Sequence, residues 1–301
     1  MTTMPSRDFK TMFPQIPADA PIVSQSTINS LEISPCRWLY RAEKHEPSEA
    51  MFFGTVVHGM IEGFLEGEFT TWEVINPEAA LVVAIHLAED DGFTLDEKMP
   101  AKERRAQFAL DVTDATQAWL RDWWQADDNQ DLTIRSIEEP FAMQLARDYD
   151  EPEDQPEAWF VTGGIDLLLE DWTMRDWKTS AVMWSKGKGT ALSQKEAYAM
   201  LVNDKYGIMP TKMEYVVYDR ARKYWDIRPG DITPQSVQAY RARVDGWVRY
   251  MRDPFHLCTP SDGKTRGWWS KPTYNDVWDR CPSCRHLGDS WDKKERKVDQ
   301  W

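Results

Sequence analysis

Residues 163–180 read GGIDLLLEDWTMRDWKTS, and this stretch decides the fold that the sequence predicts. An apolar run at 165–169 is followed by a polar Glu-Asp pair and then by a partly alternating run at 172–177. Two such runs around a polar break are typical of a β-hairpin. We therefore expect the first strand to carry Asp166 and the second to carry Asp176, so that the two carboxylates meet.

The chemistry of this hairpin depends on how its carboxylates are compensated. Asp166 and Asp176 lie in apolar surroundings, where an unpaired carboxylate is costly. Lys178, two residues after Asp176, balances only one of the two charges. A divalent metal ion would balance the other and could assist attack on a phosphodiester. The alternative is a buried Asp–Lys ion pair that only serves structure.

A candidate metal ligand lies upstream. The segment Gly54-Thr-Val-Val-His58 opens a helix predicted over about 55–66. His58 and Glu62 are four residues apart and share one face of that helix. His58 is therefore a candidate ligand, although a structural histidine is the alternative. The apolar face of the helix consists of Val57, Ile61, Phe64 and Leu65.

Two further polar pairs flank the hairpin in sequence. Glu138-Glu139-Pro-Phe places a polar pair at the opening of a strand that precedes it. Gln194 and Tyr198 are four residues apart on a helix predicted over 191–204, which puts them on one face.

In this order the segments resemble the RecB-family nucleases of the PD-(D/E)xK superfamily. Within that group the likeness points to the CRISPR-associated and phage-encoded RecB-like exonucleases (Cas family four) and to the nuclease domain of AddB. STINSLEISPCRWLYR (26–41) and CPSC (281–284) fit the same pattern, so the resemblance covers most of residues 24–285. The central matching segments are GTVVH (54–58), EEPF (138–141), GGID (163–166), DWKTS (176–180) and QKEAY (194–198).

The resemblance implies a ligand set for a catalytic metal ion. His58, Asp166 and Asp176 would coordinate the ion, and the backbone carbonyl of Trp177 would face it. Oxygen ligands suit Mg²⁺ or Mn²⁺, and an imidazole in the set shifts the preference toward Mn²⁺.

The resemblance also implies an activity. Lys178 would orient or activate the attacking water, and Gln194 and Tyr198 would position the DNA strand or the lysine. The implied enzyme is a metal-dependent deoxyribonuclease, a hydrolase of ester bonds. It would act as an exonuclease on single-stranded or frayed DNA ends, in recombination, repair or phage DNA processing. A non-catalytic DNA-end-binding protein is the alternative, as is a nuclease-like module beside a separate helicase or recombination protein. The oligomeric state stays open.

The predicted fold class is α/β, or α+β, with a restriction-endonuclease-like αβββαβ core whose topology comes from the resemblance. The expected organisation is a flexible tail (1–22), a nuclease core (23–67 and 131–252), a helical insertion (68–130) and a C-terminal cysteine-containing segment (253–301). Further elements are expected as helices near 77–89, 102–125 and 234–252 and as strands near 134–145, 158–162, 212–219 and 223–228.

The net charge of −14 is unusual for a protein that binds a polyanion. The acidic residues are concentrated in one segment. Residues 89–157 hold 20 acidic and 7 basic residues, a net charge of −13. Residues 205–252 hold 10 basic and 5 acidic residues, a net of +5. Since the local field rather than the total charge guides DNA to a site, the composition does not exclude a nuclease. The acidic segment is interpreted as a solvated helical surface, or as one that repels duplex.

The sequence has no run of eighteen apolar residues, and its start lacks the apolar stretch of a signal peptide. We therefore expect a soluble protein of the cytoplasm (the host cytoplasm if phage-encoded) without a membrane partner. Four cysteines in a chain of 301 residues do not form a disulfide framework, which fits a reducing compartment.

The cysteines raise a second question of metal binding. In the resembled family, one N-terminal and three C-terminal cysteines hold a [4Fe–4S] cluster that ties the chain ends together, and four thiolates are the set such a cluster needs. The corresponding residues here are Cys36, Cys258, Cys281 and Cys284. Their spacing departs from the family pattern, because no cysteine follows Cys284. A zinc site that includes His256 or His286, or no metal at all, remains an alternative.

The loop at 181–190 is a candidate contact for DNA. Lys186 and Lys188 could touch phosphate, and Trp184 could stack on an unpaired base. Trp268 and Trp269 lie in a similar glycine- and lysine-containing segment.

Overall fold

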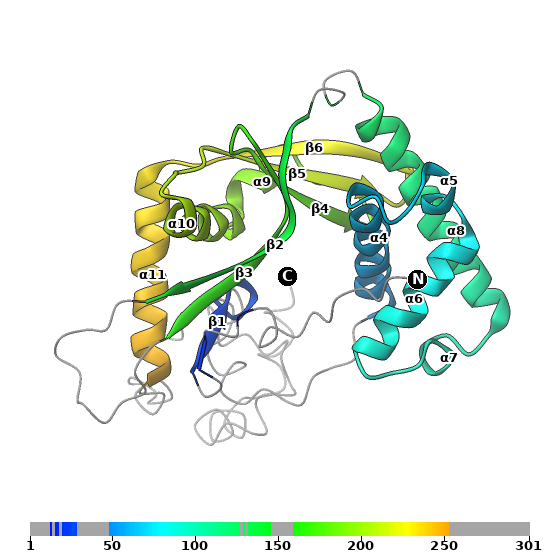
Figure 1. The fold of residues 1–301 in the computed structure, drawn as a ribbon, viewed down its shortest axis with the longest axis horizontal. Helices are drawn as coiled ribbons and strands as arrows, with labels where there is room; N and C mark the ends of the chain where they lie inside the picture. The colour runs from blue at the N-terminus through cyan, green and yellow to red at the C-terminus, as the bar shows by residue number, and fades with distance from the viewer. Residues whose placement is uncertain are drawn as a thin grey trace, which may run out of the picture. The chain divides into compact units, whose positions relative to one another are not determined.

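A computed structural model describes residues 13, 16–17, 20–28, 48–126, 129, 132–145 and 159–252 (Figure 1). The chain divides into two compact units, and each is described by itself. The first unit comprises Met1–Asp19, Pro47–Met143 and Gly163–Val237, and the second comprises Ala20–Glu46, Gln144–Thr162 and Gln238–Trp301.

The first unit opens with helix α4, Glu49–Leu65. Ser48 caps this helix by accepting a hydrogen bond from the backbone N–H of Met51. The predicted start near residue 55 is therefore wrong, because the cap and the apolar residues Phe52 and Phe53 extend the helix by almost two turns. Gly54 lies inside α4 rather than at its start.

The segment predicted as a helical insertion is helical. It contains α5 (Thr71–Val74), α6 (Pro77–Asp90), α7 (Leu95–Lys98) and α8 (Lys102–Trp119), followed by a π-helical turn, η1 (Leu120–Trp124). The short helices α5 and α7 are held by capping boxes, and α6 begins with proline at its first turn. Figure 1 shows these helices gathered beside α4.

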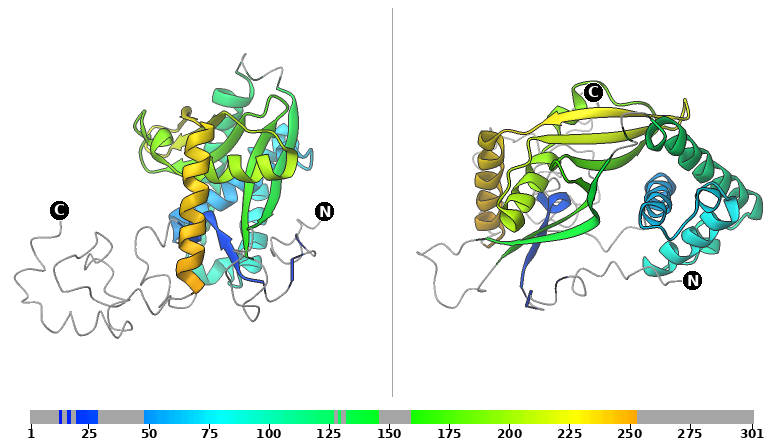
Figure 2. Two further views of the ribbon diagram at one scale, coloured as in Figure 1. Left: turned by 90° about the vertical axis from the view of Figure 1, so that its left-hand side faces the viewer. Right: turned by 45° about the horizontal axis from the view of Figure 1, so that its top comes forward.

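Five of the six strands of the sheet lie wholly or mainly in the first unit. They are β2 (Ile134–Gln144), β3 (Phe160–Leu169), β4 (Met174–Ser180), β5 (Lys212–Asp219) and β6 (Tyr224–Asp231). β3 pairs with β2 and, in antiparallel fashion, with β4. β4 and β5 are parallel, and β6 runs antiparallel to β5 as its neighbour (Figure 2). Together with α4 before β2 and α10 (Gln194–Tyr206) before β5, this is the predicted αβββαβ order, and the fold class is confirmed.

The hairpin β3–β4 differs from the sequence prediction in two details. Residues 158–162 and 165–169 are not separate strands, because β3 continues through Gly163 and Gly164. A Cβ atom at Gly163 would lie 3.0 Å from the side chain of Leu201 on α10, so a glycine lets the strand pass beneath that helix. β4 begins at Met174, since Trp172 has a φ of 66° and completes the turn.

The helix predicted over 191–204 is two helices. A short helix, α9 (Lys188–Ala191), precedes α10, and Leu192 and Ser193 separate the two helices. Gly207 ends α10 in the left-handed conformation that glycine favours. The last described helix, α11 (Pro234–Arg252), begins with proline directly after Thr233, as the sequence predicts.

A cluster of tryptophans packs behind β4. Trp119 and Trp123 stack with ring centroids 5.2 Å apart. Both rings meet the edge of Trp177, at 5.7 and 4.8 Å between centroids. Because Trp177 is fully buried there, the next residues on either side of it along β4 point to the opposite face of the sheet.

In the second unit, strand β1 (Ile22–Ser24) pairs in parallel with Phe160–Thr162 of β3. Tyr240, Val244 and Val248 recur every four residues along α11 and are buried, which is the pattern of a helix with one apolar face. No helix within the described part of the chain is both long and apolar enough to span a membrane.

Candidate metal centre

Three acid-base side chains converge on the face of the sheet opposite the tryptophans. His58 from α4, Glu138 from β2 and Asp166 from β3 each offer a ligand atom, and these atoms all lie within 4.8 Å of one another. The Nδ1 atom of His58 lies 3.6 Å from Oδ2 of Asp166. The structure thus brings together two predicted ligands, His58 and Asp166.

Glu138 was not predicted as a ligand. The sequence signal was present, because Glu138 opens the EEPF segment that carries part of the family resemblance. Its backbone has a φ of 45°, a left-handed conformation that is uncommon for a residue other than glycine. Such a conformation costs about 1–3 kcal/mol and persists only where the surrounding structure enforces it.

Asp166 also contacts the neighbouring strand. Its Oδ2 atom accepts a hydrogen bond of 2.6 Å from the backbone N–H of Trp177 on β4. This bond aligns the two strands at the point where their functional residues face each other. The predicted role of the Trp177 carbonyl as a metal ligand stays a prediction.

Asp176 is almost fully buried, with 1% of its surface exposed, and is held from three sides. Its Oδ2 atom contacts the ammonium of Lys178. Its Oδ1 atom accepts a hydrogen bond of 2.9 Å from Nε2 of Gln194 and a longer one of 3.4 Å from the hydroxyl of Tyr198. Gln194 Nε2 also lies 2.6 Å from that hydroxyl. The predicted pair on α10 therefore contacts Asp176.

The electrostatics of the hairpin follow from this crowding. Burial raises the pKa of Asp176 to about 6, the charge of Lys178 opposes the rise, and the nearby charge of Asp166 adds to it. Burial also lowers the pKa of Lys178, but the carboxylates of Asp176 and Asp166 outweigh this effect and raise it overall.

These residues fit a divalent metal ion. The carboxylates of Glu138, Asp166 and Asp176 outnumber the ammonium of Lys178, so the site has an excess of negative charge. The Oδ2 atom of Asp176 is buried and faces the ammonium of Lys178, which balances only one of these carboxylates. A set of carboxylate oxygens with one imidazole suits Mg²⁺ or Mn²⁺.

The loop after β4 lies close to this centre. The ring of Trp184 packs at 5.6 Å from the ring of Tyr215, and Tyr215 is the register partner of Asp176 across β4 and β5. The ammonium of Lys188 lies 4.1 Å above the Trp184 ring, and both Lys186 and Lys188 are exposed. The predicted DNA contacts therefore lie beside the strand that carries Asp176 and Lys178.

Other predicted site residues lie outside the described residues. They include the cysteines predicted to hold a cluster, the histidines of the zinc alternative and two tryptophans, namely Cys36, Cys258, Cys281, Cys284, His256, His286, Trp268 and Trp269. The iron–sulfur cluster thus stays a prediction, as does the contact between the C-terminal segment and the Cys36 region.

Comparisons with known proteins give one family. Residues 22–287 match the family described as the PD-(D/E)XK nuclease superfamily. No curated protein sequence matches the chain.

Among the solved structures that resemble the chain are three that are each 10% identical to it. A "putative exonuclease" from Eubacterium rectale has a TM-score of 0.49, with 89% of this chain and 95% of that chain covered. The protein SSO0001 has a TM-score of 0.27, with 74% and 85% covered. Rai1 from Scheffersomyces stipitis has a TM-score of 0.23, with 79% and 64% covered.

Proposed function

The chain belongs to the PD-(D/E)XK nuclease superfamily, and on that premise we propose that it is a metal-dependent deoxyribonuclease that degrades DNA from its ends. The observation that carries this proposal is the convergence of His58, Glu138 and Asp166 beside the Asp176–Lys178 pair. The three residues form a ligand set for a divalent ion, and Lys178 beside them is a cation that can face a phosphate.

The residues divide the work of phosphodiester hydrolysis. His58, Glu138 and Asp166 would hold the ion, and Asp176 would be a further ligand. The bound ion lowers the pKa of water and offsets negative charge on phosphate oxygens. Lys178, held by Asp176, orients the attacking water and stabilises the charge that grows on the phosphate.

The substrate of the proposed enzyme is DNA with an unpaired end. Trp184 offers a ring for stacking on an unpaired base once Lys188 moves from its face to a phosphate, and the exposed Lys186 offers a second charge. The proposed setting is recombination, repair or phage DNA processing, with a helicase or recombination protein as a partner.

The test compares DNA substrates and point variants of the full chain. Linear and circular single-stranded DNA and end-labelled duplex are incubated with Mn²⁺, with and without a chelator. We expect linear DNA to be degraded, circular DNA to persist and the chelator to stop cleavage. Asp176→Ala and Lys178→Ala should each slow cleavage by about 10²–10³-fold or more while the circular dichroism spectrum is retained.

Lys223→Ala is the matched control, because Lys223 forms an ion pair with Asp114 on the surface instead. It should leave the rate unchanged. Full activity in both site variants, or cleavage that survives the chelator, would refute a metal-dependent nuclease at this site. Rapid cleavage of the circle would retain the nuclease and refute the preference for ends.

A further inference from the structure

The residue after the candidate ligand Glu138 is anchored to α10. The carboxylate of Glu139 accepts hydrogen bonds from the hydroxyl of Ser136 at 2.6 Å, the ammonium of Lys205 at 2.6 Å and the hydroxyl of Tyr206 at 2.5 Å. Lys205 and Tyr206 form the last turn of α10, so Glu139 connects β2 to the end of that helix.

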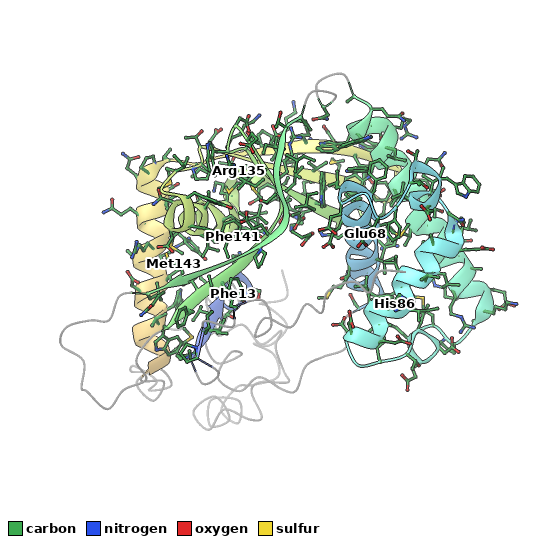
Figure 3. All side chains as sticks on the ribbon, in the orientation of Figure 1. Phe13, Glu68, His86, Arg135, Phe141 and Met143 are labelled. Carbon is green, nitrogen blue, oxygen red and sulfur yellow. The ribbon has the colours of Figure 1, made fainter. Side chains whose placement is uncertain are left out.

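The contacts of β2 with α10 continue on both sides of Glu138. Phe141, which shares a face with Glu139, packs edge-on against the ring of Tyr206 at 6.3 Å. On the other side, the guanidinium of Arg135 lies 4.2 Å above the ring of Trp172 and 5.7 Å from that of Tyr206. Figure 3 labels Arg135 and Phe141, both on β2.

The backbone between these contacts is in an unfavourable conformation. Glu138 has a φ of 45°, and Pro140 restricts Glu139 to extended backbone. A chain released from its anchors would relax toward the ordinary extended conformation, which would turn the Glu138 side chain. The ligand position of Glu138 therefore depends on what holds the residues beside it.

We propose that Glu139 is a positioning residue for the metal centre. Its bonds to Lys205 and Tyr206 hold the left-handed backbone of Glu138 and thereby keep the Glu138 carboxylate near His58 and Asp166. The inference rests on the proposed function, because it takes Glu138 as a metal ligand. It gives α10 a second role, since the first turn of the same helix carries Gln194, which holds Asp176.

An ion pair that served only stability would behave differently. Lys205 is 45% exposed and Glu139 is 14% exposed, so solvent partly screens this ion pair. A structural role would alter the melting temperature without affecting metal binding. A positioning role predicts a loss of metal affinity that disappears once the Glu138 carboxylate is removed.

The experiment is a double-mutant cycle on Mn²⁺ affinity, measured by titration calorimetry on the full metal-free chain. Glu139→Gln should raise the Kd for Mn²⁺ by about tenfold, as the loss of a partner behind a metal ligand commonly does. Tyr206→Phe, which removes one of the hydrogen bonds, should raise the Kd by a smaller factor. In a Glu138→Gln background, Glu139→Gln should have no further effect.

Lys223→Met is the control, because it removes a surface ion pair far from Glu138 in sequence and should leave the Kd within about twofold. A Kd within twofold of wild type in both Glu139→Gln and Tyr206→Phe overturns the proposal. So does an equal effect of Glu139→Gln with and without the Glu138 carboxylate. Should Glu139→Gln fail to fold, the cycle is run with Tyr206→Phe.

The outcomes separate this inference from the proposed function. Mn²⁺ binding that Glu139→Gln weakens, in a chain that does not hydrolyse DNA, supports the positioning role and refutes the nuclease. Mn²⁺-dependent hydrolysis with an unaltered Kd in the variants supports the nuclease and refutes the positioning role. A wild-type chain that binds no Mn²⁺ refutes both.

Discussion

The two carboxylate oxygens of Asp176 contact different residues of the site. One oxygen faces Lys178, and the other faces α10, where Gln194 and Tyr198 both approach it. Their distances to the Asp176 carboxylate show which of the two residues supports it more directly. Gln194 donates at 2.9 Å, whereas the Tyr198 hydroxyl is at 3.4 Å and lies closer to Gln194. Gln194 is therefore the main support of Asp176, and Tyr198 acts chiefly by orienting Gln194.

We predict that Gln194→Ala slows single-turnover cleavage of labelled single-stranded DNA more than Tyr198→Phe does. A hydrogen bond to a charged group contributes about 1.5–3 kcal/mol, which corresponds to roughly ten- to a hundredfold in rate. Tyr198→Phe keeps the packing of the ring and should cost less than tenfold. A larger loss in Tyr198→Phe than in Gln194→Ala would show that the tyrosine acts on the substrate directly.

At the scale of elements, the site depends on how closely α4 approaches β4. A Cβ atom added at Gly54 would lie 2.9 Å from Oγ1 of Thr179, the residue after Lys178. Gly54 is one turn before His58 on α4, so the lack of a side chain there allows the helix that carries the imidazole to approach the strand that carries Asp176.

Two effects compete when Gly54 is replaced by alanine. Alanine inside a helix is favoured over glycine by about 1 kcal/mol, whereas overpacking costs about 1–3 kcal/mol. We predict that Gly54→Ala alone leaves the free energy of unfolding unchanged or lowers it. In the Thr179→Ala background, where the obstructing oxygen is absent, Gly54→Ala should raise it by about 1 kcal/mol.

Urea unfolding of the four proteins in this cycle measures the coupling. Gly246→Ala on α11 is the matched helix control, because a Cβ atom there would meet nothing within 4 Å. Gly246→Ala by itself should raise the free energy of unfolding. Identical effects of Gly54→Ala with threonine and with alanine at position 179 would show that the Thr179 hydroxyl does not limit how closely α4 approaches β4.

At the scale of the whole molecule, charge is distributed so that acid and base partly offset each other on the surface. Lys223 in the β5–β6 turn pairs with Asp114 of α8, and Arg121 pairs with Asp122 beside it. Part of the acid on the predicted insertion is therefore neutralised locally. The exposed lysines of the 181–190 loop remain available to a polyanion despite the net charge of −14.

This distribution predicts how DNA binding depends on salt. Lys186→Ala and Lys188→Ala should each weaken binding of single-stranded DNA at every sequence tested. Each should also reduce the slope of log Kd against log salt concentration by about one. Fluorescence anisotropy with the inactive Lys178→Ala chain measures both quantities, and Lys223→Ala serves as the control. Slopes unchanged in both loop variants would exclude the loop from the DNA interface.

Metal binding should be visible in the stability of the molecule. An ion that binds only the folded state stabilises it by about 2.7 kcal/mol when its concentration is a hundred times its Kd. We predict that Mn²⁺ raises the Tm of the wild-type chain by several degrees in scanning calorimetry and that Asp166→Asn loses most of this shift. An equal shift in Asp166→Asn would place the metal elsewhere in the chain.

Elements with a clear local signal were predicted well from the sequence. The apolar and alternating runs around Glu170 and Asp171 determined the β3–β4 hairpin, and thus the proximity of Asp166 to Asp176 and Lys178. Periodicity also indicated α6, α8, β5 and α11. These predictions succeeded because each depends on residues adjacent along the chain, where side-chain periodicity reports directly on backbone conformation.

Contacts between distant segments were decided only by the tertiary structure. Glu138 belongs to the EEPF segment of the family resemblance, but it becomes a candidate ligand only because β2 pairs with β3 and brings it to His58 and Asp166. The side chain of Leu201 on α10 limits the space at position 163 of β3, where a glycine fits. The anchoring of Glu139 likewise needs the end of α10 beside β2. The physical cause of these three features is packing between elements, which no local pattern of residues encodes.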